Sequence, residues 1–308
     1  CLDAEQTLPQ CLDAVRATDH PPDRVELILV DNGSRDRSLA IARERGATVL
    51  ERPGATIGAL RNAGAAAARG DVLAFLDADC IPRRDWIGNG AGAALEEAAV
   101  VGYPYDAPEH ASWVERAWFA QRRPGRRDVP SLSGGNLVLQ RVLFEQVGGF
   151  DTRLRTGEDA EFCARARAVA RVIADDRVRV VHLGNPRTAR DFLRREIWYG
   201  LGALGTLKAE PFDLPFLGTV WFLACTALQL AGTVTLLLGG SAALLGGATL
   251  GVLLLLVATL LHRRRFLRGP LHALQLGALY WLYYLGRSLA LGLLLTGRRF
   301  DHRGRKGA

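Results

Sequence analysis

The amino-acid sequence predicts an α/β domain with a Rossmann-like, mostly parallel sheet, followed by helices that cross a membrane. Apolar runs alternate with helical patterns up to about residue 210, and acidic residues stand where several of these runs end. Between residues 215 and 296, charged side chains are rare. Alternating strands and helices indicate a parallel sheet, which binds ligands at the carboxyl ends of its strands. We therefore divide the 308-residue chain into a soluble domain at 1–210, a membrane region at 211–297 and a basic tail at 298–308.

Each element of the soluble part follows from the spacing of its apolar residues. Nearly continuous apolar runs predict buried strands at 25–30, 47–51, 71–79, 99–104 and 177–183. Apolar residues three or four positions apart, with turn residues at the ends, predict helices at 7–16, 36–45, 56–69, 85–97, 113–119, 158–169 and 188–207.

Two runs, 216–238 and 242–261, contain no charged residue, and each is long enough to cross roughly 30 Å of hydrocarbon. The arginines at 263–268 favour the cytoplasmic side, which places the soluble domain in the cytoplasm of a multi-pass protein of the cell membrane. The third run, 271–296, contains Arg287. It either crosses the membrane, which would put the basic tail outside, or lies at the interface or against the soluble domain.

The chain carries a net charge of +7, and much of its basic excess flanks the apolar runs. Anionic lipid headgroups explain such flanking charge, so we expect a membrane and no nucleic acid as partner. The five cysteines form no C-x-x-C pair and no zinc spacing, and we expect them to be reduced.

The strand at 71–79 ends in the stretch FLDADC, in which Asp77 and Asp79 are two residues apart. Side chains at this spacing point to one face of a strand and can converge on one cation at its end. Mg²⁺ and Mn²⁺ prefer such oxygen ligands together with phosphate oxygens. The alternative is an ordinary solvated turn.

Four stretches occur in an order that resembles the family 2 glycosyltransferases of the GT-A fold: LILVDNGSRDRS at 27–38, ALRNAGAAAARGDVLAFLDADC at 59–80, SGGNLVLQRVLFEQVGGFDTRLRTGEDAEFCARAR at 133–167 and VVHLGNPRTARDFLRREIWYGLG at 180–202. This resemblance implies an inverting transferase that depends on a divalent metal, Mg²⁺ or Mn²⁺. It implies a nucleoside diphosphate sugar as donor, with a UDP-sugar favoured. The acceptor would be a hydroxyl of a lipid, a lipid-linked sugar or a polysaccharide at the cytoplasmic face of the membrane.

The resemblance also implies a role for particular residues. The catalytic base would be Asp159. The metal site would comprise Asp79, Asp77 and His182. The nucleotide sugar would be bound by Asp3, Glu5, Asp31, Asp36, Arg61 and Asp77. The acceptor side would include Gly135, Asn136, Glu158, Trp198 and Tyr199, although the Q-x-x-R-W motif of the family is imperfect in RREIWYG.

Simpler interpretations stand beside these roles. Asp31 and Asp159 are also placed to cap or begin helices. His182 is alternatively a histidine of the core, and Arg61 an arginine on the solvated face of a helix. A polyprenyl-phosphate sugar synthase would share the fold and the donor, and an inactive membrane scaffold would bind a nucleotide sugar without transfer. The first strand of the family precedes CLDAEQTLPQCL and is missing, so we expect the natural chain to begin further upstream.

Overall fold

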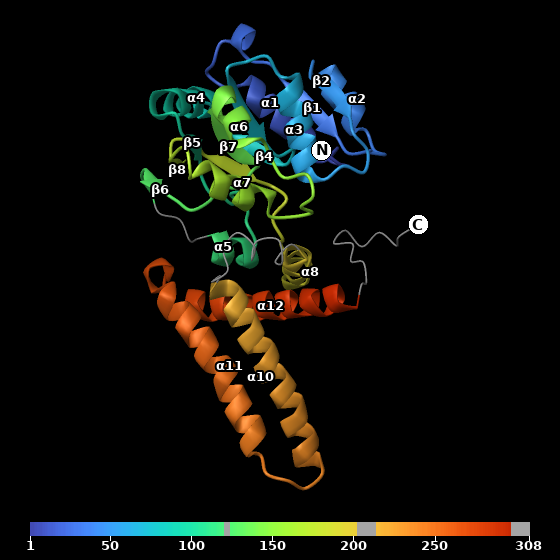
Figure 1. Ribbon diagram of the computed structural model, residues 1–308, viewed down its shortest axis with the longest axis vertical. Coiled ribbons are helices and arrows are strands. Elements are labelled where there is room, and N and C mark those ends of the chain that lie inside the picture. Colours follow the sequence, from blue (N-terminus) through green and yellow to red (C-terminus); the bar gives the residue numbers. More distant parts are fainter. Residues whose placement is uncertain (120–123, 202–213, 297–308) are drawn as a thin grey trace. The chain divides into compact units, whose positions relative to one another are not determined.

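The computed structural model separates the chain into two compact units, and each is described by itself (Figure 1). The residues that the structure describes are 1–119, 124–201 and 214–296. The first unit comprises Cys1–Glu109 and Arg122–Asn185, and the second comprises His110–Gln121 and Pro186–Ala308. The predicted boundary near residue 210 and the predicted tail at 298–308 lie outside the described residues.

A five-stranded sheet forms the centre of the first unit, and its strand order is β3-β7-β5-β8-β6. These strands are β3 (Val72–Leu76), β7 (Asn136–Gln140), β5 (Val100–Gly102), β8 (Val172–Ala174) and β6 (Arg127–Asp128). β5 and β8 are parallel, whereas β7 runs antiparallel to both β3 and β5, and β6 runs antiparallel to β8. The predicted α/β class is correct, but this sheet is mixed, not mostly parallel. The direction of β7 depends on the path of the chain before it, which apolar spacing does not reveal.

Two shorter sheets complete the first unit. β1 (Ile28–Asp31) pairs with β2 (Thr48–Glu51) in parallel. β4 (Cys80–Pro82) pairs with β9 (Val180–His182) in antiparallel register, and Cys80 lies directly opposite His182. Residues directly opposite each other on paired strands place their side chains on the same face. This register therefore brings a thiol next to an imidazole just after the two predicted metal-binding acids.

Among the described residues of the first unit, six helices pack around these sheets. They are α1 (Leu8–Arg16), α2 (Ser38–Glu44), α3 (Ile57–Ala67), α4 (Trp86–Glu97), α6 (Arg141–Val147) and α7 (Glu158–Ala166), with a short 3₁₀ turn, η1, at Pro22–Arg24. Thr56 caps α3 by accepting a hydrogen bond from the Ala59 amide at 3.3 Å. Phe162 of α7 is completely buried in the core below the five-stranded sheet. All these helices except α6 were predicted, because their apolar residues recur at helical spacing.

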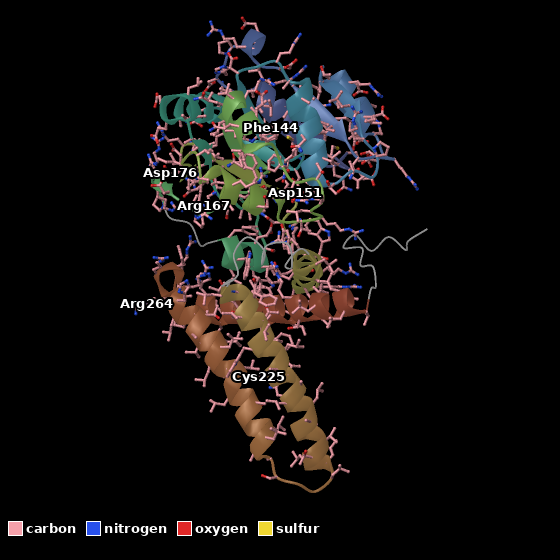
Figure 2. All side chains as sticks on the ribbon, in the orientation of Figure 1. Phe144, Asp151, Arg167, Asp176, Cys225 and Arg264 are labelled. Atoms are coloured by element: carbon pink, nitrogen blue, oxygen red, sulfur yellow. The ribbon has the colours of Figure 1, made fainter. Side chains whose placement is uncertain are left out.

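The second unit is helical in its described residues. It contains α5 (Trp113–Phe119), α8 (Ala189–Gly200), α10 (Leu214–Leu237), α11 (Ala243–His262), the 3₁₀ turn η2 (Arg264–Phe266) and α12 (Pro270–Leu295). α10, α11 and α12 are long and apolar enough to cross a membrane. α10 and α11 form a hairpin, and α12 runs crosswise to them (Figure 1). Figure 2 shows few nitrogen or oxygen atoms along this hairpin near Cys225, while Arg264 lies at the end of α11.

Candidate active site

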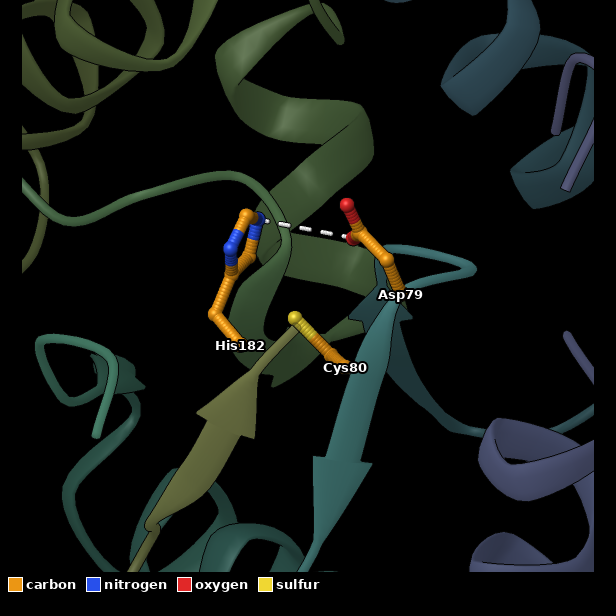
Figure 3. Close-up of side chains that lie close together, drawn as sticks. All are labelled: Asp79, Cys80 and His182. Carbon is orange, nitrogen blue, oxygen red and sulfur yellow. Dashed lines mark ion pairs between the residues drawn. The ribbon is translucent and has the colours of Figure 1, made fainter. Parts of the chain in front are cut away.

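Asp79, Cys80 and His182 form the centre of the candidate site in the first unit. Each offers one ligand atom, and these atoms all lie within 4.8 Å of one another. His182 Nε2 is 3.4 Å from Asp79 Oδ1, and the Cys80 thiol points toward this pair (Figure 3). The structure thus brings together two of the three predicted metal ligands, which are about 100 residues apart in the sequence.

The surroundings of His182 fit a metal site. Its ring stacks on Tyr105 with centroids 4.5 Å apart, and its Nδ1 atom is buried without a hydrogen-bond partner among the described residues. A Cβ at Gly184 would overlap Asp79 Oδ2, so only glycine leaves the carboxylate its position. A carboxylate and an imidazole can bind a divalent cation such as Mn²⁺, whereas a thiolate suits a softer metal such as Zn²⁺. A divalent cation therefore fits the residues that the chain provides here.

Asp77 is not part of this cluster, although it was predicted to share the metal. Its carboxylate receives a hydrogen bond from Arg61 at 3.0 Å and another from the hydroxyl of Tyr105 at 3.3 Å. Burial raises the pKa of Asp77, but Arg61 and His182 outweigh it and hold the pKa below its usual range. Asp77 is therefore ionised and faces the arginine.

Arg61, on α3, links Asp77 to the first turn of α7. Its guanidinium also donates to Glu158 at 2.6 Å and lies 5.5 Å from the centroid of the Phe150 ring. Burial, followed by the neighbouring carboxylate of Asp159, raises the pKa of Glu158 in spite of this arginine. The alternative of a solvated Arg61 is wrong, because its side chain is only 12% exposed.

Asp159, the predicted catalytic base, is half-buried at the start of α7. Its Oδ2 atom accepts a hydrogen bond from the Gly134 amide at 3.2 Å, and its Oδ1 atom accepts one from Ala160 at 2.8 Å. Glu158 beside it is buried and tied to Arg61. Asp159 is therefore the more accessible of these two acids for a proton from a bound molecule.

Gly134, Gly135 and Asn136 form the turn that leads into β7. A Cβ at Gly134 would overlap Arg61, and one at Gly135 would overlap Asp77. Asn136 is completely buried, and its side chain bonds Tyr103, Val178 and Trp86. The predicted acceptor-side role of the Asn136 side chain does not fit this geometry, because the amide holds three segments of the core together.

The four acids predicted to bind the donor nucleotide gather around the loop after β1. Asp31 is completely buried and accepts hydrogen bonds from the amides of Gly33 and Ser34, both at 2.8 Å. The other three acids also bind backbone amides: Asp3 binds Arg35, Glu5 binds Arg37, and Asp36 binds Glu5 and Ser38. These acids hold residues 1–5 against residues 31–38.

The predicted acceptor-side residues Trp198 and Tyr199 belong to the second unit. Their rings lie 5.1 Å apart near the end of α8. Tyr199 is 38% exposed and lies 5.8 Å from the guanidinium groups of both Arg195 and Arg287.

Sequence reasoning missed Cys80, Tyr105, Ser133 and Gly184. Tyr105 is partly buried, contacts Asp77 and forms a short hydrogen bond with Ser133. The carboxylate of Asp77 contributes, after burial, to raising the pKa of Tyr105 well above its ordinary value, so the phenol stays protonated and donates. Of these four residues, only Cys80 could have been suspected from the sequence, because it directly follows Asp77 and Asp79.

Two curated glycosyltransferases are similar to this chain in sequence. Glycosyltransferase AglE of Haloferax volcanii is 27% identical over 173 residues, which cover 52% of this chain and 57% of that protein. The pre-mycofactocin glycosyltransferase of Mycobacterium tuberculosis is 27% identical over 169 residues, which cover 50% of this chain and 35% of that protein. The chain thus matches only a third to just over half of the length of these relatives.

Two solved structures share the fold over nearly the whole chain. The mannosyltransferase PcManGT from Pyrobaculum calidifontis, in complex with GDP-Man and Mn²⁺, superposes with a TM-score of 0.61 at 16% identity, over 97% of this chain and 86% of that one. S. aureus TarS 1-349 in complex with UDP-GlcNAc gives a TM-score of 0.50 at 15% identity, over 97% and 91% of the two chains.

The mixed sheet, its flanking helices and these fold similarities show the GT-A fold. Residues 1–149, just under half of the chain, match the family model described as Glycosyl transferase family 2, in agreement with the resemblance found in the sequence. The predicted family and fold are confirmed.

Proposed function

We propose that the first unit transfers a sugar from a nucleoside diphosphate sugar to a hydroxyl of an acceptor at the membrane. The observation that carries this proposal is the pairing of Asp79 with His182, 3.4 Å apart. Transfer requires that the leaving diphosphate be stabilised. A divalent cation held by Asp79 and His182 would supply that stabilisation as a Lewis acid.

Asp159 is the proposed base of this reaction. It would accept the proton of the acceptor hydroxyl as that oxygen attacks the anomeric carbon, while the diphosphate leaves from the opposite side. A single displacement of this kind inverts the anomeric centre. The half-buried position of Asp159, with the Gly134 amide on one of its oxygens, supports this role.

Similar proteins support a nucleotide sugar as donor without choosing among nucleotides. PcManGT is described with GDP-Man and Mn²⁺, and TarS with UDP-GlcNAc. Both resemble this chain in fold at about the same low identity. A UDP-sugar therefore stays the proposed donor, and Mg²⁺ or Mn²⁺ the proposed metal.

The membrane is the proposed site of action. The exposed residues of α10 and α11 include at least ten large apolar side chains, among them Leu230, Leu237 and Leu253. Such a surface is stable only in lipid or against another apolar surface. The arginines at 263–268 favour the cytoplasmic side for the adjacent end of α11. We therefore propose that the acceptor is a lipid, a lipid-linked sugar or a growing polysaccharide at the cytoplasmic face.

Calorimetric titration of UDP, GDP and dTDP, with and without Mn²⁺, tests the donor site of the full chain in detergent. We expect one nucleotide to bind, and to bind only with Mn²⁺. Asp79→Asn should weaken or abolish this Mn²⁺-dependent binding, whereas Asp19→Asn, which removes an exposed partner of Arg84, should bind as the unchanged protein does. A folded protein that binds no nucleotide in any condition would refute the transferase proposal and favour a scaffold.

A further inference from the structure

α12 differs from α10 and α11, although its length alone would let it cross a membrane. Within its most apolar stretch of 18 residues, 33% of the residues are buried inside the structure, against 17% for α10 and 11% for α11. Arg287 lies in the interior of α12. One side of α12 is therefore covered by protein, and the question is which element covers it.

α8 lies against that side at very short range. A Cβ at Gly286 would lie 2.8 Å from the Cβ of Glu196, and a Cβ at Gly200 would lie 2.5 Å from that of Ala290. Glycine at these positions lets the two helix backbones approach each other. Leu279 of α12 is completely buried in the same cluster as Phe192 of α8. α8 thus covers the middle of α12 from Leu279 to Ala290.

A buried ion pair joins the two helices. Arg287 Nη2 lies 3.3 Å from Glu196 Oε2, and the side chain of Glu196 is only 3% exposed. The Arg287 guanidinium also lies 5.0 Å from the centroid of the Tyr283 ring. Separating the helices would leave a charge without its partner, which strongly disfavours separation. α8 and α12 therefore stay packed against each other, whether α12 lies in the membrane or at its surface.

α8 is unsuited to the interior of a bilayer. Five of its twelve residues are charged: Arg190, Asp191, Arg194, Arg195 and Glu196. Charged side chains are costly in hydrocarbon and are rare in spanning segments. If α12 crossed the bilayer, its middle would carry α8 to the same depth. The packing of α8 therefore argues against a crossing.

The side of α12 turned away from α8 is apolar and exposed. Its exposed large apolar residues are Leu271, Leu274, Trp281, Leu289 and Leu295. At about 3.6 residues per turn these positions fall within about one third of the circumference. A helix with one apolar side, a Trp on that side and a charged layer on the other matches a helix that lies in the membrane interface.

We infer that α12 lies along the membrane surface, with its Leu and Trp stripe in the lipid and α8 on the aqueous side. The part of the chain that the structure describes then crosses the membrane twice, through α10 and α11, and not three times. The arginines at 263–268 and those at 298–305 fall on the same, cytoplasmic side, as the positive-inside tendency favours. This inference rests on the membrane attachment proposed above, but not on the transfer reaction.

Reporter fusions to the full chain test the number of crossings. One pair of fusions places green fluorescent protein or alkaline phosphatase after Ala308, and a matched pair inserts them between Gly239 and Gly240, in the turn between α10 and α11. We expect fluorescence without phosphatase activity at Ala308, and the reverse in the turn. Ala308 and the turn on the same extracytoplasmic side would overturn the inference. Both positions in the cytoplasm would instead refute the membrane crossing of the α10–α11 hairpin.

The depth of α12 provides a second measurement. Nitroxide labels on cysteines at positions 274, 281 and 289 sit about 10 and 12 Å apart along the helix axis. The depth of each label in the membrane is measured from its accessibility to oxygen and to a nickel chelate. If α12 is interfacial, all three labels should have the same depth. A crossing helix would give the label at Trp281 the greatest depth. That gradient would contradict the inference even if the fusions misfolded.

Discussion

Arg61 connects the two groups of acids in the candidate site. It is the residue that pairs with both Asp77 and Glu158, which lie 16 and 97 positions away in the sequence. A buried carboxylate needs such a partner, because desolvation of an isolated charge is expensive. The arginine thereby fixes the turn after β3 relative to the first turn of α7.

Replacing this arginine should destabilise the first unit. Arg61→Met leaves Glu158 buried without its partner, and we expect a loss of about 3–5 kcal/mol in the free energy of unfolding. Chemical unfolding of the full chain in detergent, followed by tryptophan fluorescence, measures this loss. Adding Glu158→Gln should restore part of it, because the uncompensated charge is then gone.

Arg69→Met is the matched control, since Arg69 is 87% exposed and pairs with Glu26 at the surface. Its effect should stay below about 1 kcal/mol. Equal effects of the two substitutions would show that the Arg61 pairs do not stabilise the unit.

Asp159 should affect transfer and not donor binding. Asp159→Asn keeps the acceptor of the Gly134 hydrogen bond but cannot take up a proton, so transfer should fall by about 10²–10⁴-fold. Calorimetry with the donor nucleotide and Mn²⁺ should give an unchanged affinity. Glu161→Gln, which removes another first-turn acid of α7, should retain transfer. Normal transfer by Asp159→Asn would dismiss it as the base.

The turn between residues 133 and 136 requires a glycine at position 135. Gly135 belongs to the turn that enters β7, and its backbone oxygen accepts a hydrogen bond from the Asp77 amide at 3.2 Å. Two turns from distant parts of the chain thus meet at the carboxylate of Asp77. Glycine permits this close approach because it lacks a Cβ.

Gly135→Ala should therefore disturb the site more than its size suggests. The new methyl group would overlap Asp77 and Tyr105, and we expect a loss of about 1–3 kcal/mol in stability together with the loss of Mn²⁺-dependent nucleotide binding. Gly88→Ala is the control, because a Cβ at this position of α4 meets nothing within 4 Å. It should be neutral or slightly stabilising, since alanine favours a helix over glycine. Full nucleotide binding by Gly135→Ala would refute the close approach.

At the level of elements, apolar spacing predicted the helices better than the sheet. α4 and α5 lie where the sequence placed helices, because local spacing reports which face each helix buries. α6, β4, β6, β7 and β8 were not predicted. β8 has only three residues and lies next to the end of α7, so its apolar run was too short to separate from the helix before it.

At the scale of the whole molecule, most of the exposed large apolar side chains of the described residues belong to the second unit, although the first unit exposes a few. Leu253 in α11 is 53% exposed, and Leu95 in α4 is 54% exposed. An arginine in the middle of a spanning helix costs about 2.5–3.5 kcal/mol on insertion scales, whereas one at a protein surface in water costs little. The same substitution at these two leucines therefore tests their surroundings.

Leu253→Arg should lower the fraction of the full chain that resists extraction from membranes by alkaline carbonate. Leu95→Arg should leave that fraction unchanged, because we place α4 in the cytoplasm. Circular dichroism of both purified variants controls for folding. Equal extraction of the two variants would contradict a membrane position for α11.

The sequence by itself determined the α/β class, the order of most helices and strands, the acids at strand ends and the uncharged runs of the second unit. These features depend on neighbouring residues, whose spacing and composition record local burial. The tertiary structure decided which distant residues meet. It placed Cys80 opposite His182, tied Arg61 to Glu158, buried Asn136 and laid α8 along α12. Each of these contacts depends on the path of the chain between the partners, which no local pattern encodes.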